Sequence, residues 1–260
     1  MNLQIKDKVV IVTGGAKGIG EGIVRVLAKE GAIPVIIGRK EADNLRVVEA
    51  IRAEGGNAAQ VVAELTRPED SKRAVEQVLE LFGRIDGLIN NAGVNDSVGL
   101  ESGSYEQFMH SLHKNVVHYY LMAHYALPAL KASKGAIVNI GSKVAETGQG
   151  GTSAYAASNG GRNALTREWA VELLPYGIRV NAVIVAECYT PLYETWINTL
   201  PDPGEKLSSI TAKIPLEKRM TTAEEIANAA VFLLSGASSH TTGQLIYVDG
   251  GYTHLDRSIS

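Results

Sequence analysis

The sequence has a single cysteine, so no internal disulfide can form, and this suits a reducing cytoplasm. It contains no apolar run of the roughly 20 residues needed to span a bilayer, and its first residues lack the apolar stretch of a secretory signal. It also has no excess of basic residues, because 25 Lys and Arg oppose 28 Asp and Glu and give a net charge of −3. We therefore expect a cytoplasmic protein with neither a membrane nor nucleic acid as its partner.

Strand-like and helix-like segments alternate along the 260 residues, and the composition, with 45% hydrophobic and 20% charged residues, is that of an ordinary globular protein. The expected strands, apolar almost throughout as in a sheet buried on both faces, are Val9–Thr13, Pro34–Ile37, Ala58–Val62, Gly87–Asn90, Ala136–Ile140, Arg179–Val183 and Gln244–Val248. The expected helices are Gly18–Glu30, Asp43–Glu54, Pro68–Phe82, Tyr105–Leu130, Ala154–Leu174 and Ala223–Ser235. This alternation predicts one α/β domain over residues 1–260, with a Rossmann-type, doubly wound, parallel sheet of seven strands.

The segment 190–220 lies between the sixth and seventh expected strands and contains the Pro- and Gly-rich stretch Leu200–Gly204. Long connections inside a compact domain commonly line or cover a binding site. We therefore expect a substrate loop or lid here rather than a boundary between domains.

A glycine-rich loop follows the first expected strand and opens the first expected helix. Its glycines are Gly14, Gly18 and Gly20, with Lys17 and Ile19 between them. Glycine permits a tight turn and close approach of the backbone to a pyrophosphate, and the free N–H groups of a helix N-terminus bind phosphate oxygens. A plain strand-to-helix turn would also use glycine, but the position at the first βα turn favours a dinucleotide.

The end of the second expected strand bears on which nicotinamide cofactor would bind. NAD-selective sites usually place an acidic residue there to bind the ribose 2′-hydroxyl, whereas this chain has Gly38 followed by Arg39. A guanidinium can bind a 2′-phosphate, and Lys17 adds a second positive charge. The pattern predicts a preference for NADP with NAD still possible, unless the two side chains are ordinary surface charges.

Three further candidate site segments follow later in the sequence. Asn91 and Gly93 belong to an Asn-Asn-Ala-Gly segment after the fourth expected strand, Ser142 lies at the end of the fifth, and Tyr155 begins a helix. Together with the glycine loop and Asn115, they resemble the short-chain dehydrogenase/reductase family.

The resemblance implies a role for each residue. Tyr155 would be the acid/base for the hydroxyl proton, Ser142 would hold the substrate oxygen, and Asn115 would orient a helix and a proton-relay water. The cofactor would be bound by Gly14, Lys17, Gly18, Ile19, Gly20, Arg39, Glu64, Leu65, Asn91, Gly93, Tyr155, Asn159, Cys188 and Thr190. The family commonly pairs through long helices, which implies a homotetramer.

Asn159 departs from the family, because Tyr155 should be followed four residues later by a lysine. One helical turn places residues 155 and 159 on the same face, where an ammonium would stabilise the phenolate of Tyr155 and bind the nicotinamide ribose. The amide of Asn159 can hydrogen-bond but carries no charge, so we expect weak turnover. The chain could be an engineered variant, a natural paralogue with little activity, or an enzyme in which another cation such as Lys143 substitutes.

The substrate side resembles the L-fucose dehydrogenase-like members of the family. Gln149, Glu187 and Tyr193 would line a sugar pocket, with Val94 or Asn95 at its rim. Oxidation at the anomeric carbon would give a lactone. A partly exposed loop acid is the ordinary interpretation of Glu187. The alternatives are a dehydrogenase for another secondary alcohol, such as a steroid or polyol, and a non-catalytic NADP-binding sensor.

Two remaining features carry no expected chemistry. His110, His113, His118 and His124 fall on one expected helix but have no evident Cys or carboxylate partner, so no metal site is expected. The tail from Gly250 to Leu255 could contact a neighbouring subunit or be loose.

Overall fold

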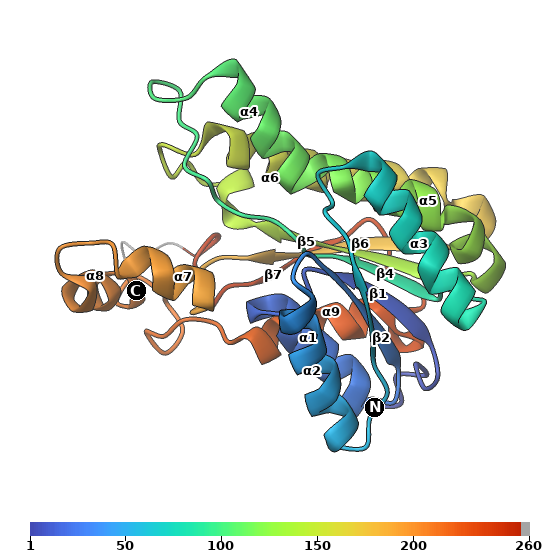
Figure 1. Ribbon diagram of the computed structural model, residues 1–260. Coiled ribbons are helices and arrows are strands. Elements are labelled where there is room, and N and C mark those ends of the chain that lie inside the picture. Colours follow the sequence, from blue (N-terminus) through green and yellow to red (C-terminus); the bar gives the residue numbers. More distant parts are fainter. Residues whose placement is uncertain (256–260) are drawn as a thin grey trace.

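A parallel sheet of seven strands forms the centre of the protein, in the order β3-β2-β1-β4-β5-β6-β7, in a computed structural model that describes residues 1–255 (Figure 1). The strands are β1 (Val9–Thr13), β2 (Ile33–Gly38), β3 (Ala59–Val62), β4 (Gly87–Asn90), β5 (Ala136–Ser142), β6 (Arg179–Val185) and β7 (Leu245–Val248). Because β1 pairs with β2 on one side and β4 on the other, the order of the strands reverses there. The predicted Rossmann-type, single-domain α/β fold is confirmed, with small shifts at strand ends.

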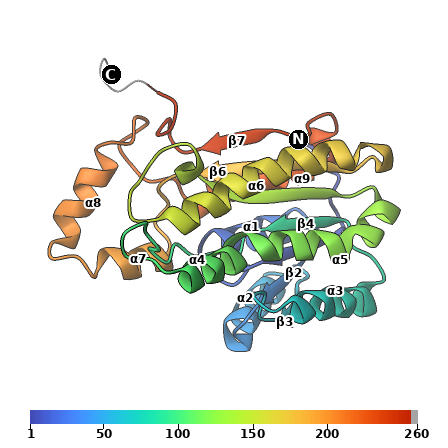
Figure 2. The same cartoon turned by 90° about the horizontal axis from the view of Figure 1, so that it is seen from above.

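Helices cover both faces of the sheet (Figures 1 and 2). One layer contains α1 (Gly18–Lys29), α2 (Glu41–Ala53) and α9 (Ala223–Leu234), and the other contains α3 (Pro68–Phe82), α5 (His118–Ser133) and α6 (Ser153–Glu172). Successive side chains of a strand point to opposite faces, so Val10 and Val12 of β1 join one apolar core while Val9 and Ile11 join the other. This double burial is why the strands are apolar at almost every position.

The expected helix over residues 105–130 is not continuous. It begins as α4 (Tyr105–Leu112), whose first turn is capped reciprocally by Ser104 and Gln107, and it ends as α5. Between the two lies a π-helical turn, His113–Val117. Such turns insert one extra residue into a helix and recur at functional sites. Three short 3₁₀ turns complete the helical elements of the described chain: Lys143–Ala145, Leu174–Tyr176 and Gly236–Ser238.

The segment 190–220 contains more regular structure than a loop. It forms α7 (Pro191–Ile197) and α8 (Pro203–Thr211), which stand away from the sheet in Figures 1 and 2. Thr190 and Asp202 begin the two helices by accepting backbone N–H groups at 3.2 and 2.9 Å. Proline at the first helical position suits both starts.

The tail is anchored to its own chain as far as Leu255. Asp249 accepts the backbone N–H groups of Gly251 and Thr253 at 2.8 and 2.9 Å. The ring of His254 packs edge-on against Tyr247, with centroids 4.3 Å apart. The loose tail considered from the sequence is therefore wrong for these residues.

A chain of buried polar groups joins the sheet to α6. Asn90 of β4 donates to the side chain of Asn139 on β5 at 3.0 Å, and Asn139 donates to Thr166 of α6 at 2.9 Å. The hydroxyl of Thr166 donates to the main-chain oxygen of Arg162 at 2.8 Å. Because buried amides are costly without partners, this network fixes how α6 sits over the strands.

Candidate active site

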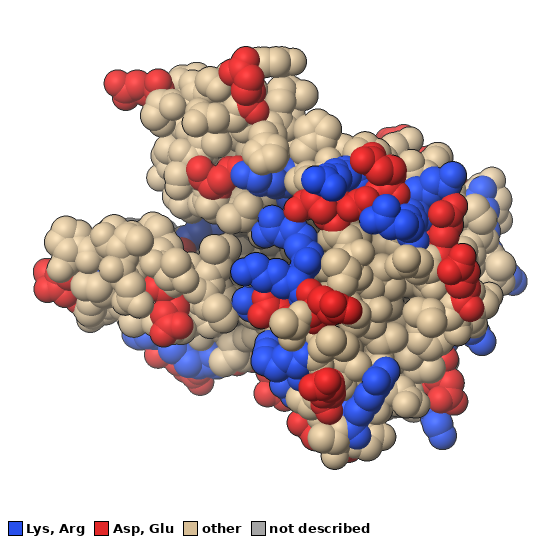
Figure 3. Space-filling model, viewed as in Figure 1, with Lys and Arg blue, Asp and Glu red and all other residues tan. Residues whose placement is uncertain are grey.

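The predicted site residues lie at the carboxyl edge of the sheet. β1 and β4 are neighbours, and the helices that follow them cover opposite faces, which opens a crevice beyond their carboxyl ends. The glycine loop follows β1, the Asn-Asn-Ala-Gly segment follows β4, and Ser142 ends β5. Figure 3 shows a hollow between the lobe with α4 and the lobe with α7 and α8, with Lys and Arg side chains beside it.

The glycine loop has the geometry of a phosphate-binding turn. Gly18 has a φ of +55°, and an added Cβ would lie 3.1 Å from the side chain of Thr190. A Cβ on Gly20 would lie 2.1 Å from the main-chain oxygen of Gly14, which excludes a side chain there. The side chain of Lys17 makes no capping hydrogen bond to the first turn of α1. Those N–H groups are therefore free to bind a phosphate.

Hydrogen bonds hold the Asn-Asn-Ala-Gly segment against the glycine loop. The hydroxyl oxygen of Thr13 accepts the backbone N–H groups of Asn91 and Ala92 at 2.9 and 3.0 Å. The Asn91 amide donates to the main-chain oxygens of Thr13 and Gly14 at 3.0 and 3.3 Å. Ile19 is partly buried against the apolar core beside α1. Two predicted cofactor segments are thus brought together as one unit.

The end of β2 cannot take an acidic residue without rearrangement. A Cβ on Gly38 would lie 2.5 Å from Oδ1 of Asn44, whose amide nitrogen is itself bound to the Gly38 oxygen at 3.1 Å. Arg39 follows and is 73% exposed. Lys17 forms a 2.8 Å ion pair with Asp43, and Arg39 forms a longer one of 3.5 Å with Glu64, so Arg39 is the more loosely paired of the two predicted phosphate-binding cations. These residues fit a nicotinamide dinucleotide.

Glu64 and Leu65, which were predicted to bind the cofactor, follow β3. Leu65 is buried, and Glu64 accepts the backbone N–H and hydroxyl of Thr66 at 3.1 and 3.0 Å. Partial burial opposes ionisation of Glu64, but the Thr66 hydrogen bonds and the positive charge of Arg39 outweigh it and lower its pKa. Glu64 therefore stays anionic and is held in place.

Ser142 and Tyr155 are the predicted groups with access to a substrate. Ser142 ends β5, and its hydroxyl oxygen accepts a long hydrogen bond of 3.4 Å from the backbone of Val144. Tyr155 lies in the first turn of α6, which packs against the 3₁₀ turn that follows Ser142. Both residues are partly exposed. Proton transfer and oxyanion binding need this accessibility.

Asn115 lies buried in the π-helical turn and holds a loop rather than facing the solvent. Its side-chain nitrogen donates to the main-chain oxygen of Val94 at 3.0 Å, and its side-chain oxygen accepts the Val94 N–H at 2.8 Å. This two-way bond fixes the end of the Asn-Asn-Ala-Gly segment. The predicted relay water has no counterpart among these contacts, so that role stays a prediction.

Asn159 is fully buried on α6 and uses both ends of its amide. The nitrogen donates to the main-chain oxygen of Tyr155 at 2.8 Å, and the oxygen accepts an N–H of Arg162 at 3.1 Å. A lysine at this position would extend further and carry charge. The side chain of Asn159 has no exposed surface. Its predicted contact with the cofactor stays a prediction.

Arg162 belongs to the site but was missed by sequence reasoning. It is 3% exposed and donates to the main-chain oxygens of Asn115 and Ile140 at 2.6 and 3.0 Å. Its guanidinium also lies 4.3 Å from the centre of the Tyr119 ring. A signal for it existed, because residue 162 falls seven positions after Tyr155, on the same helix face, where a charge is unexpected.

Glu187 is not the free loop acid that its sequence position suggested. It forms a short ion pair with Lys143, whose ammonium also lies 3.9 Å from the centre of the Tyr252 ring. Both charged side chains are mostly buried. Burial, and then the nearby Glu187 carboxylate, raise the pKa of Tyr193. Lys143 is therefore engaged by Glu187 and the Tyr252 ring, which argues against it as the substitute for the missing lysine.

Of the remaining predicted binding residues, two are exposed and one is buried. Gln149 and Asn95 are exposed, and Asn95 accepts the backbone N–H of Ser97 at 3.2 Å. Cys188 is instead buried in the apolar core, and burial raises the pKa of its thiol to about 12. Any cofactor contact by Cys188 would come from its backbone.

The histidines do not form a cluster. His118 is buried with Nε2 2.9 Å from the main-chain oxygen of Lys114. Within residues 1–255, no three His, Cys, Asp or Glu side chains lie together as a metal site would require. Over the same residues, no helix has both the length and the apolar character of a membrane span.

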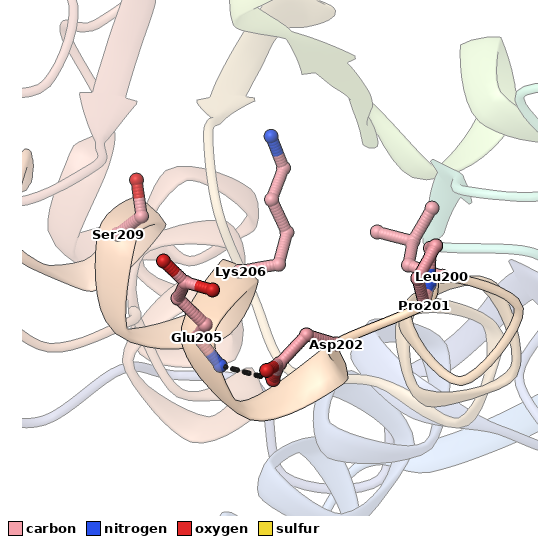
Figure 4. A pocket seen from close by; sticks show the side chains of 6 residues that line it. All are labelled: Leu200, Pro201, Asp202, Glu205, Lys206 and Ser209. Atoms are coloured by element: carbon pink, nitrogen blue, oxygen red, sulfur yellow. Dashed lines mark hydrogen bonds between the residues drawn. The ribbon is translucent and has the colours of Figure 1, made fainter.

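A second hollow lies on the outer lobe, which contains α8 (Figure 4). Its lining residues are Leu200, Pro201, Asp202, Glu205, Lys206 and Ser209. Figure 4 shows that they come from α8 and the turn before it, and that Asp202 is engaged as the helix cap. The hollow contains no predicted catalytic group.

Comparison with known proteins agrees with this arrangement. A family model described as enoyl-(acyl carrier protein) reductase matches residues 14–253. L-fucose dehydrogenase from Bos taurus is 36% identical over 252 residues, covering 96% of this chain and 91% of the relative. Cyclopentanol dehydrogenase from Comamonas testosteroni is 34% identical over 251 residues, covering 96% and 98%. The crystal structure of Cj0485 dehydrogenase superimposes with a TM-score of 0.93 at 45% identity, covering 99% and 98%. With its glycine loop, Ser142 and Tyr155 at one sheet edge, this chain belongs to the short-chain dehydrogenase/reductase family of oxidoreductases.

Proposed function

We propose that the protein is an NADP-preferring dehydrogenase that oxidises the anomeric hydroxyl of L-fucose or a related aldose to a lactone. The observation that carries this proposal is the Lys143–Glu187 ion pair at the substrate side, with Tyr193 beside it. An ion pair and a phenol offer donors and acceptors to the several hydroxyls of a sugar. The similarity to L-fucose dehydrogenases supports the same substrate class.

The chain's own residues would carry out the proton chemistry. Tyr155 takes the hydroxyl proton of the anomeric carbon, and Ser142 donates a hydrogen bond to the same oxygen. A bound nicotinamide would supply the acceptor for the hydride that leaves that carbon. The C–O single bond becomes the C=O bond of the lactone, and the proton passes from Tyr155 to solvent. Because Asn159 carries no charge, turnover would be lower than with a lysine at position 159.

The preference for NADP rests on the end of β2. Arg39 is exposed there, and its guanidinium matches the oxygens of a 2′-phosphate. An acidic residue at position 38, which would repel the phosphate and favour NAD, would have to displace the side chain of Asn44. Lys17 adds charge once its pair with Asp43 opens.

Residue exposure on α5 supports an oligomer, and we propose a cytoplasmic homotetramer. Tyr120 is 49% exposed and stacks on His124, with ring centroids 5.7 Å apart. Exposed aromatic side chains are enriched at protein interfaces. Light scattering on the purified protein would measure the assembly directly.

A less polar alcohol is the second candidate substrate. Tyr189, Leu192 and Trp196 are 48%, 55% and 44% exposed around the start of α7. An apolar surface there would suit a cyclic alcohol or steroid better than a sugar, and cyclopentanol dehydrogenases are among the relatives.

The test is cofactor reduction with a panel of aldoses, cyclopentanol and a hydroxysteroid, at neutral pH and near pH 10. Preferred oxidation of L-fucose with NADP supports the proposal, and preference for cyclopentanol or the steroid supports the second candidate. Tight NADP binding with no oxidation at either pH would instead indicate a non-catalytic sensor. Substitution of Glu187 by Gln should raise KM for the sugar more than it lowers kcat.

A further inference from the structure

Arg162 is a buried cation whose partners, within residues 1–255, include no carboxylate. Every acceptor around it is neutral: the main-chain oxygens of Asn115 and Ile140 and the side-chain oxygens of Asn115 and Asn159. Exposed Arg84 instead pairs with Asp86 at 2.6 Å. Arg179 also donates only to main-chain oxygens, but it is less buried than Arg162. A buried charge without a counterion is costly, and a negative charge that formed nearby would compensate it.

We infer that Arg162 supplies the positive charge that Asn159 lacks, and that it stabilises the phenolate form of Tyr155 during proton transfer. Its catalytic consequence rests on the proposed function, but the electrostatic effect itself does not. Arg162 acts through Asn159 and the π-helical turn, and it is therefore a positioning residue.

Helix geometry places the three residues in a row. Tyr155, Asn159 and Arg162 are spaced by four and three residues, so all three lie on one face of α6. The guanidinium points back toward Asn159, because it donates to the Asn159 side chain at 3.1 Å. Asn159 in turn donates to the main-chain oxygen of Tyr155. The charge is thereby held on the side of α6 that carries the catalytic tyrosine.

Tyr119 indicates that Arg162 and Tyr155 share one electrostatic environment. Burial raises the pKa of Tyr119, the positive charge of Arg162 opposes that rise, and the charge of Tyr155 adds to it. Tyr119 therefore lies within electrostatic reach of both residues. Its hydroxyl donates to the same Ile140 oxygen that accepts an N–H of Arg162.

The π-helical turn leaves a carbonyl free for Arg162. Nε of Arg162 donates to the Asn115 main-chain oxygen at 2.6 Å, and an N–H of the same guanidinium reaches the Asn115 side chain at 3.5 Å. An added Cβ on Gly93 would lie 2.7 Å from the guanidinium and 2.9 Å from Asn115, so glycine there makes room for both. Two distant segments thus accommodate one arginine.

Other titratable groups around α6 do not provide this charge. Burial, and then the charge of Arg162, lower the pKa of His118 to about 3, so it is neutral at physiological pH. Lys114 pairs with Asp96 at 3.4 Å. The other titratable or charged groups on the elements packed against α6 are Tyr105, Glu106, His110, His113, Lys143, Tyr176 and Arg179, and Lys143 pairs with Glu187.

The experiment measures the phenolate absorbance of Tyr155 during a pH titration without substrate or cofactor. The signal of Tyr155 is the absorbance of each protein minus the absorbance of the same protein carrying Tyr155→Phe. Arg162→Gln removes the charge but keeps a hydrogen-bonding side chain. It should move the midpoint upward by about one pH unit, the size expected of a unit charge roughly 10 Å away at an effective dielectric constant of about 20. Arg162→Lys keeps the charge and should hold the midpoint, and exposed Arg167 on the same helix gives the matched control Arg167→Gln.

An unchanged midpoint in folded Arg162→Gln overturns the inference and leaves Arg162 as a structural clamp. If Arg162→Gln does not fold, the midpoint is measured instead in two proteins that both carry Asn159→Lys. One of them keeps Arg162, and the other also carries Arg162→Val. An upward shift on removing Arg162 there supports the inference, and no shift overturns it. A shifted midpoint in a protein that oxidises none of the alcohols would sink the proposed function alone, whereas oxidation of L-fucose with an unmoved midpoint would sink the inference alone.

Discussion

The side-chain oxygen of Asn159 accepts an N–H of Arg162 at 3.1 Å inside α6. The position at which the family places a catalytic lysine is thus linked to an arginine one helical turn further along. The missing charge and the extra charge lie on the same helix face, so a substitution at either position changes the charge on the side of α6 that carries Tyr155.

Restoring the lysine should raise activity. In Asn159→Lys, an ammonium one turn from Tyr155 would stabilise its phenolate and raise kcat at neutral pH about tenfold, which corresponds to ~1.4 kcal/mol of barrier. The measurement is kcat across pH for the wild-type and variant proteins with the same sugar. Equal rates at neutral pH would mean that the neutral amide does not limit proton transfer.

The doubly wound, parallel sheet and the glycine loop at its first βα turn could be predicted, because apolar strands, βα alternation and glycine spacing are local signals. The ends of β5 and β6 were set two residues short. Gly141 and Ser142 are small or polar, but they pair with Ile184 and Val185, and this pairing continues both strands. The π-helical turn could not be predicted, because it depends on Arg162 and Val94, which contact Asn115 from other parts of the chain.

The Lys143–Glu187 pair illustrates the same limit. The two residues are 44 positions apart, and each alone is compatible with a surface charge. Only the pairing of β5 with β6, in which Ser142 lies opposite Val185, brings them together. Sequence reasoning placed Glu187 at the substrate side and missed its partner.

Arg39 should determine cofactor preference. The substitution Arg39→Gln removes a charge-assisted contact to the 2′-phosphate. It should weaken NADP binding about tenfold or more and leave NAD binding nearly unchanged. Binding titrations with both cofactors measure this. Arg67 is an exposed control, and Arg67→Gln should change neither affinity. A similar loss for both cofactors in Arg39→Gln would indicate a contact with the shared pyrophosphate instead.

Removing one member of the Lys143–Glu187 pair should destabilise the protein more than removing both. Glu187→Gln leaves a mostly buried ammonium without its counterion and should lower the free energy of unfolding by about 3 kcal/mol. The double variant Lys143→Met, Glu187→Leu should recover much of that loss, because no charge remains buried. Urea unfolding of the three proteins gives the comparison, and equal stability of Glu187→Gln and wild type would mean that solvent screens the pair.

His118 should make stability depend on pH. Burial, and then the charge of Arg162, lower its pKa to about 3 in the folded protein, whereas an unfolded histidine titrates near pH 6.5. Between these values the unfolded chain binds the extra proton, so the stability of the folded state falls as pH decreases, by up to ~1.4 kcal/mol per pH unit from this group. His118→Gln should lose that part of the slope between about pH 6.5 and pH 4, measured by urea unfolding. Exposed His124 on the same helix supplies the control His124→Gln, which should keep the wild-type slope. A wild-type slope in His118→Gln would mean that the buried ring gains its proton without cost, contrary to its burial beside Arg162.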